Sequence, residues 1–158
     1  MRARRGFNLI LDQYASPQQL GERIALYRAE RAANGHPPAP MQIAVARQLY
    51  VAKDRAEAAA ARERAALYTQ RTVEVSRAPG ANTGSHVLSY ADGAGGTEAH
   101  ALYGTPDELH RKLDELGRAG AEYLLLTAVT GGQEQLRRFA RDVMPAFADQ
   151  QAIEPAPV

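Results

Sequence analysis

The chain has 158 residues, of which 45% are hydrophobic and 23% are charged, and its formal net charge at pH 7 is +1. This composition is typical of a soluble globular protein, and the near-neutral charge argues against a nucleic-acid partner. The absence of cysteine excludes disulfides, thiolate metal ligands and a cysteine nucleophile.

The first apolar segment, Phe7–Leu11, has the length of a β-strand. Asp12 interrupts it too early for the core of a signal peptide or for a membrane span. We therefore expect a cytoplasmic protein with no membrane partner.

Strand and helix patterns alternate along the rest of the first half. An S-x-x-Q capping box at Ser16 predicts a helix over 17–33, which an Asn-Gly pair ends. Apolar residues then alternate with small or polar ones over Met41–Val51, which predicts a second strand. Asp54 is placed to cap an alanine-rich helix over 54–72.

The second half carries a helix, a strand and a further helix. Thr105 opens a T-x-x-E capping box with proline at the first helical position, which predicts a helix over 106–118. Tyr123–Leu126 is a short apolar run, typical of a parallel strand covered on both faces. A Gly-Gly pair then precedes a helix over 133–147. The chain is thus predicted to be an α/β fold with three principal parallel strands and four flanking helices.

Two segments fall outside this alternation. Residues of about 75–103 contain clusters of glycine, proline, serine and asparagine, and a loop of that length in a compact domain is usually a functional lid or disordered. The last segment, 151–158, reads as a flexible tail. We expect one domain over 1–150, with a lid insertion at about 75–103.

Several segments of the chain match a known family in order. They are the helix start GTPDE at Gly104–Glu108, the strand AGAEYLLL at Ala119–Leu126, the VMP end at Val143–Pro145 and, upstream, Gly6–Gln13, Tyr27–Gly35 and Gln48–Ala58. In this series the chain resembles the C-terminal part of the bacterial luciferase-like flavin-dependent monooxygenases. The resemblance implies a (β/α)8 TIM barrel, of which only the C-terminal portion is present.

The length of the chain sets it apart from a complete barrel. A (β/α)8 barrel typically needs about 250 residues, more than the 158 present. One explanation is a truncated gene or a wrongly assigned start. The other is a genuine half-barrel that pairs with a second copy or with a complementary barrel half.

The candidate site residues follow from the rule that barrel enzymes place their chemistry at the C-terminal ends of strands. The residues selected as cofactor-binding are Asp12, Gln13, Arg47, Thr127, Thr130, Gly131 and Gly132. Gln48 is a further polar residue on the second strand. For Arg47 the alternative is a charge that faces the helices, and for Asp12 and Gln13 it is ordinary solvation of a strand end. The start of the last helix is either a phosphate cradle or only a helix cap.

The resemblance implies a flavin-dependent oxidoreductase or monooxygenase with FMN as cofactor, a deazaflavin coenzyme as the alternative, and a small-molecule substrate. The cofactor then carries the reaction while the barrel orients the reactants. The competing interpretation is a non-catalytic half-barrel subunit or a homo-oligomeric interaction protein. The four histidines show no metal-ligand spacing, so no metal is predicted. His86 and His100 lie in the lid segment within possible reach of a substrate, but no catalytic residue is assigned.

Overall fold

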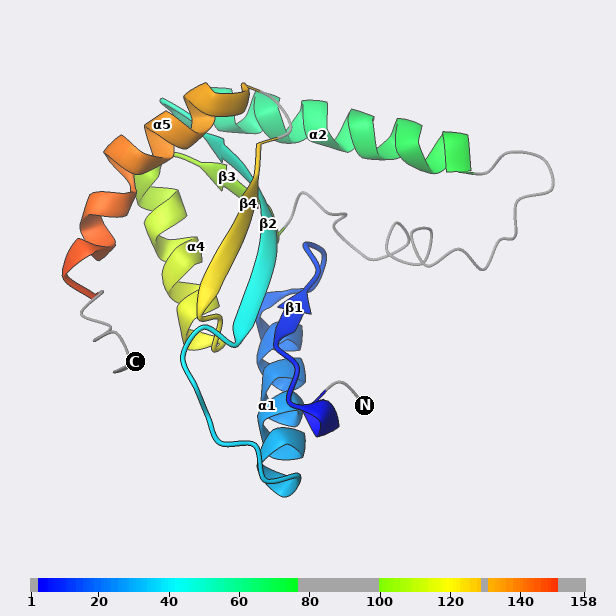
Figure 1. The fold of residues 1–158 in the computed structure, drawn as a ribbon. Coiled ribbons are helices and arrows are strands. Elements are labelled where there is room, and N and C mark those ends of the chain that lie inside the picture. Colours follow the sequence, from blue (N-terminus) through cyan, green and yellow to red (C-terminus); the bar gives the residue numbers. More distant parts are fainter. Residues whose placement is uncertain (1–2, 77–99, 129–130, 151–158) are drawn as a thin grey trace.

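The computed structural model describes residues 3–76, 100–128 and 131–150 (Figure 1). Most of the predicted lid and the predicted tail therefore lie outside the described residues. The described elements, in chain order, are η1 (Ala3–Arg5), β1 (Leu9–Leu11), α1 (Pro17–Ala33), β2 (Ile43–Val51), α2 (Arg55–Ser76), β3 (Leu102–Gly104), α4 (Pro106–Arg118), β4 (Tyr123–Thr127), α5 (Gly132–Asp142) and η3 (Met144–Gln150).

The strands form a parallel sheet in which β2 pairs with each of the other three. β1 pairs with residues 43–45 and β4 pairs with residues 44–48, so these two strands lie on opposite edges of β2. The three predicted principal strands are thus confirmed as parallel.

Backbone hydrogen bonds fix the edge on which β3 lies. Successive residues of a strand direct their N–H and C=O groups to alternate edges. The Gln42 carbonyl accepts from the Leu9 N–H of β1, and the Ala52 N–H donates to the Gly104 carbonyl at the end of β3; both residues have even numbers and so direct these groups to the same edge. The Ile43 carbonyl instead accepts from Glu122, just before β4. β3 therefore lies on the same edge as β1 and pairs with residues 49–51, beyond the end of β1.

The two faces of this sheet have different surroundings. The odd-numbered apolar residues of β2 pack with α1 and α4 in the main core, whose buried members include Leu20, Ile24, Ile43, Val45, Leu49, Val51, Leu109 and Leu116. We call this side the helix face. The other side, the open face, carries the even-numbered residues of β2 and their neighbours in register on β1 and β4: Ile10, Ala44, Ala46, Gln48, Tyr50, Tyr123, Leu125 and Thr127. α2 covers only the end of the open face, through Ala61 and Ala65 against Tyr50 and Tyr103.

Capping explains where the helices that cover the sheet begin. The Ser16 Oγ accepts from the Gln19 N–H at 3.2 Å, and the Gln19 Oε1 accepts from the Ser16 N–H at 3.0 Å, which is the predicted reciprocal box. At α4 the Thr105 N–H donates to Glu108 Oε2 at 3.1 Å. At α2 the Asp54 Oδ1 accepts from the Glu57 N–H at 2.8 Å. These local signals are confirmed at all three helix starts.

One prediction about burial is wrong. β4 was expected to be covered on both faces, yet Leu125 is 41% exposed, while Leu124 and Leu126 pack against the main core. The reason is that, within 3–76, 100–128 and 131–150, helices pack against only one face of this strand.

The elements also differ from the prediction in their bounds. β1 begins at Leu9 rather than Phe7, and β2 begins at Ile43 rather than Met41. β3 was not predicted, because three residues directly before a helix cap give no periodic signal. α2 runs about one turn further than expected. α5 ends at Asp142 rather than near 147, and η3 follows, because Pro145 disfavours α-helical geometry at the residue before it.

Among the described residues, no helix is both long and apolar enough to cross a membrane.

Candidate functional site

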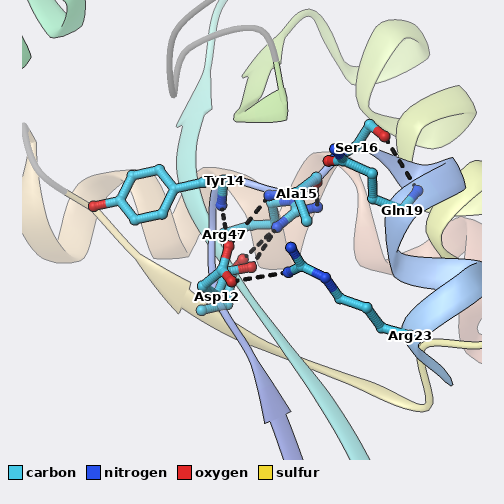
Figure 2. A network of polar contacts seen from close by, with 8 residues as sticks. Asp12, Tyr14, Ala15, Ser16, Gln19, Arg23 and Arg47 are labelled. Carbon is cyan, nitrogen blue, oxygen red and sulfur yellow. Dashed lines mark hydrogen bonds and ion pairs between the residues drawn. The ribbon is translucent and has the colours of Figure 1, made fainter. Parts of the chain in front are cut away.

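The loop that joins β1 to α1 is held by the side chain of Asp12 (Figure 2). Its Oδ1 accepts from the Tyr14 N–H at 2.8 Å and from the Ala15 N–H at 3.2 Å, and its Oδ2 accepts from Arg23 Nη1 at 3.1 Å. A carboxylate that accepts from the N–H groups two and three residues further along the chain fixes a turn. Asp12 therefore closes the loop before Ser16 starts α1.

Gln13 and Tyr14 form a pair in the same loop. Gln13 Nε2 donates to the Tyr14 Oη at 3.1 Å, and both side chains are half-buried. In Figure 2 the Tyr14 ring points away from Arg23 and Gln19. The Asp12 carboxylate is thus used to fix the turn of this loop. The Gln13 amide and the Tyr14 phenol form a separate hydrogen-bonded pair in it.

Arg47 is buried on the helix face, with 1% of its surface exposed. Its position in β2 is odd, like those of Val45 and Leu49, so its side chain lies on the helix face. Arg47 therefore faces the helices and does not point into the barrel mouth. Its Nη1 donates to the Asp12 carbonyl at 3.0 Å and to the Ala46 carbonyl at 2.9 Å, and Nη2 donates to the Ala15 carbonyl at 2.7 Å. Burial lowers the pKa of Arg47, and the charge of Asp12 opposes this shift.

A second polar group lies on the open face near the C-terminal ends of the strands. The Tyr103 Oη donates to Gln48 Oε1 at 3.1 Å, and the Tyr103 and Tyr50 rings lie 5.9 Å apart. Thr127 lies beside Gln48 in the register of β2 and β4. Sequence reasoning selected Gln48 and Thr127 but missed the two tyrosines. For Tyr50 the signal was available, because it has the same parity as Gln48.

Charges next to Tyr50 keep it as a hydrogen-bond donor. Its Oη donates to Glu57 Oε1 at 2.9 Å. Burial raises the pKa of Tyr50, and the hydrogen bond to Glu57 and the charge of Glu57 raise it further, while Arg64 and Arg138 act against these effects. The Glu57 pKa is lowered, first by the Lys53 N–H and then by the Tyr50 hydroxyl. Tyr50 therefore stays protonated at neutral pH.

The start of α5 is built around the packing of Gln135. Gly131 caps the helix in the left-handed conformation (φ 80°), and a Cβ there would come within 2.8 Å of Gln135 Cγ. Gln135 is buried, and its Oε1 accepts from the Val51 N–H at 2.6 Å at the end of β2. Gly131 thus leaves room for this side chain, while Gly132 has a positive φ of 45° and nothing within 4 Å of an added Cβ. Thr130 lies outside the described residues.

A cleft of about 540 Å³ lies at the C-terminal end of β2 and includes Pro106. Its ionisable lining residues are three basic and three acidic side chains: Lys53, Arg138, Arg141, Glu57, Glu134 and Asp142. Arg138 pairs with Glu134 at 3.3 Å and Arg141 pairs with Asp142 at 2.7 Å. Because opposite charges balance, this cleft does not select an anion.

His100 lies just before β3. Burial lowers its pKa, and the positive charges of Arg47 and Lys112 lower it further, so the neutral imidazole is favoured near pH 7. His86, the other lid histidine, is outside the described residues. No cluster of three metal-ligating side chains occurs in 3–76, 100–128 or 131–150.

Comparisons with known proteins give one family and one fold. The family model described as luciferase-like monooxygenase matches residues 1–123. No curated protein gives a significant match.

Among solved structures, the monooxygenase RslO1 from Streptomyces bottropensis is 23% identical, with a TM-score of 0.67 over 93% of this chain. The oxygenating constituent of 3,6-diketocamphane monooxygenase from Pseudomonas putida, solved in complex with FMN, is 16% identical, with a TM-score of 0.63 over 91% of this chain. The coenzyme F420-dependent tetrahydromethanopterin reductase from Methanopyrus kandleri is 15% identical, with a TM-score of 0.57 over 89% of this chain.

In each case this chain spans less than half of the solved protein: 44%, 44% and 45% of the respective chains. At these identities the likeness shows the fold. That fold is a partial TIM barrel, with parallel strands and flanking helices.

Proposed function

Because the chain belongs to the luciferase-like monooxygenase family, we propose that it forms the C-terminal part of the barrel of a flavin-dependent oxidoreductase that acts on a small molecule. The family match over residues 1–123 carries this proposal. The bound flavin supplies the redox chemistry, and the barrel supplies orientation and a dry pocket.

The residues at the barrel mouth fit a flavin ring better than a flavin phosphate. Gln48, Tyr103 and Thr127 are neutral hydrogen-bonding groups near the C-terminal ends of strands, where barrel enzymes bind their ligands. Neutral donors and acceptors suit the polar edge of a ring system. Arg47, in contrast, directs its guanidinium to backbone carbonyls. We therefore propose that this chain contacts the ring, and that most of the phosphate contacts come from the rest of the barrel.

FMN is the proposed cofactor and coenzyme F420 the alternative. One solved protein of the same fold is described in complex with FMN, and another is described as dependent on F420. The earlier candidates Gln13, Thr127, Thr130, Gly131 and Gly132 remain proposed cofactor contacts at the mouth.

A second candidate function is a half-barrel subunit that acts by association. The observation that favours it is the open face, where Ile10 is 59% exposed and Leu125 is 41% exposed. Apolar side chains exposed on a sheet with free edges promote association. A complementary barrel half suits this face better than a second copy. Among the described residues β3 continues the edge on which β1 lies, so the sheet is three strands wide and two copies give six strand positions, whereas a TIM barrel has eight.

Fluorescence titration of FMN tests the proposal. The 158-residue chain alone is expected to bind FMN weakly or not at all. The completed barrel, made by joining the first half in frame or by adding it as a separate chain, is expected to bind FMN, and Gln48→Ala should weaken that binding. Gln18→Ala, on the exposed surface of α1, is the matched control. Tight binding by the chain alone contradicts the partial-barrel account, and no binding by the completed barrel contradicts FMN as the cofactor and moves the test to F420.

A further inference from the structure

Two buried arginines in this chain are held in the same way at opposite ends of α1. Arg47 donates to the carbonyls of Asp12, Ala15 and Ala46, and Arg31 donates to the carbonyls of Gly6 and Pro37 at 2.7 and 3.2 Å. Their exposed fractions are 1% and 7%, and among the described residues the Nε atom of each has no hydrogen-bond partner. Arg31 also donates to the Tyr27 Oη at 3.5 Å, so only Arg47 binds backbone carbonyls alone. Both guanidinium groups hold the backbone that surrounds them. The two arginines differ in the segments that they hold: Arg31 binds the carbonyls of Gly6 and Pro37, whereas Arg47 binds the loop between β1 and α1.

Arg47 lies where one edge of β2 lacks a partner strand. On that edge β1 covers residues 43–45 and β3 covers residues 49–51. The Ala46 carbonyl points into this gap, and Arg47 Nη1 donates to it. The β1–α1 loop fills the rest of the gap, and Arg47 holds it through the Asp12 and Ala15 carbonyls. Between the parts of β2 that pair with β1 and β3, the Arg47 guanidinium thus binds the Ala46 carbonyl and holds the β1–α1 loop next to β2.

The same loop is fixed from its other side by a carboxylate. Asp12 accepts from the Tyr14 and Ala15 N–H groups and from Arg23 (Figure 2). With carbonyls held by Arg47 and N–H groups held by Asp12, the backbone of the loop has little freedom. The side chains of Gln13 and Tyr14 bond to each other and lie at the C-terminal end of a barrel strand.

We propose that Arg47 is a positioning residue: together with Asp12 it fixes the β1–α1 loop so that the Gln13–Tyr14 pair contacts the ring of the bound flavin. This inference rests on the function proposed above and revises its site. Asp12 and Arg47 become supports for the loop, and Gln13 and Tyr14 join Gln48, Tyr103 and Thr127 as groups that touch the cofactor. A neutral amide and a phenol suit uncharged ring heteroatoms, and a ligand-binding loop needs such support from a rigid scaffold.

Hydrogen exchange on the 158-residue chain tests the positioning step without any cofactor. Arg47→Met should speed exchange at the Tyr14 and Ala15 amides by about tenfold or more, because it removes charge-assisted hydrogen bonds to the loop. Arg47→Lys, which keeps the charge and a donor, should restore part of the protection. Arg31→Met is the matched control: it removes another buried guanidinium, from the other end of α1, and should leave the two loop amides unchanged. Equal effects of Arg31→Met and Arg47→Met on these amides would overturn the positioning role.

Titration of FMN against the completed barrel tests the contact step. Arg47→Met, Gln13→Ala and Tyr14→Phe should each weaken FMN binding by several-fold or more, while Arg31→Met leaves the affinity unchanged even where it lowers the melting temperature. Loss of loop protection without loss of affinity would overturn the contact. If the unsubstituted completed barrel does not bind FMN, both the proposed cofactor and the flavin contact fall, whereas the exchange experiment still decides the role of Arg47.

Discussion

The helix face and the open face belong to the same strands but differ in how far other elements cover them. On the helix face, Leu11, Val45 and Leu49 pack against α1 and α4 in one continuous core. On the open face, one residue away along each outer strand, Ile10 and Leu125 remain substantially exposed. The described part of the chain therefore supplies a complete core on the helix face and only part of one on the open face. This difference is what a partial barrel predicts, because the helices of a TIM barrel form the outer ring and its interior is filled by all eight strands.

The largest expected effect distinguishes neighbouring residues of β1. Leu11, 8% exposed, belongs to the core, so Leu11→Ala should lower the free energy of unfolding by about 2–4 kcal/mol. Ile10→Ala, one residue before it, should lower it by about 1 kcal/mol or less, since the side chain is mostly in solvent. Chemical denaturation of both variants gives the two values. Equal losses would show that the open face is packed in solution.

A smaller effect is expected at the cap of the helix that covers this core. Ser16→Ala removes the acceptor of the Gln19 N–H and should lower the free energy of unfolding by about 1 kcal/mol. Gln18→Ala, two residues on and exposed, should change it by only a few tenths of a kcal/mol, because its side chain bonds only to Glu22 on the surface. If the two variants have the same stability, the capping box does not hold α1 in place.

The smallest expected effect is the contribution of Glu57, a residue of α2, to the pH dependence of stability. The pKa of Glu57 is lowered from 4.5 in the folded chain, so its contribution to stability is complete above that value and is lost as the pH falls through the folded pKa. Between roughly pH 6 and pH 3, the melting temperature of Glu57→Gln should therefore fall less than that of the unsubstituted chain. Glu63→Gln, an exposed residue of the same helix, should behave like the unsubstituted chain. If the melting temperature of Glu57→Gln falls with pH as steeply as that of the unsubstituted chain, Glu57 does not contribute to the loss of stability in acid.

Local signals were enough to predict most of the fold. The capping boxes at Ser16 and Thr105 act within four residues, so they are read directly from the sequence. The alternation along β2 also assigns each of its residues to a face. It places Arg47 with Val45 and Leu49, which is the orientation that the structure has.

The site depended on contacts between distant segments and was only partly predictable. The bond between Tyr103 and Gln48 joins residues 55 positions apart, and it requires β3, which is too short to give a pattern. The gap in the β1 edge that Arg47 fills exists only because β1 and β3 cover different parts of β2. The sequence therefore indicates which residues are polar at strand ends, while the fold decides which of them meet.

The central claim is that the open face becomes the interior of a completed barrel, and a tryptophan at position 125 tests it most directly. The chain contains no tryptophan, so Leu125→Trp gives a single reporter on the open face. In the chain alone its emission should be that of a solvated indole. When the first half of the barrel is added, with the unsubstituted mixture subtracted, the emission should shift to shorter wavelength at the same stoichiometry at which FMN binding appears. An indole that is already buried in the chain alone, or one that stays solvated while FMN binds, would contradict the account.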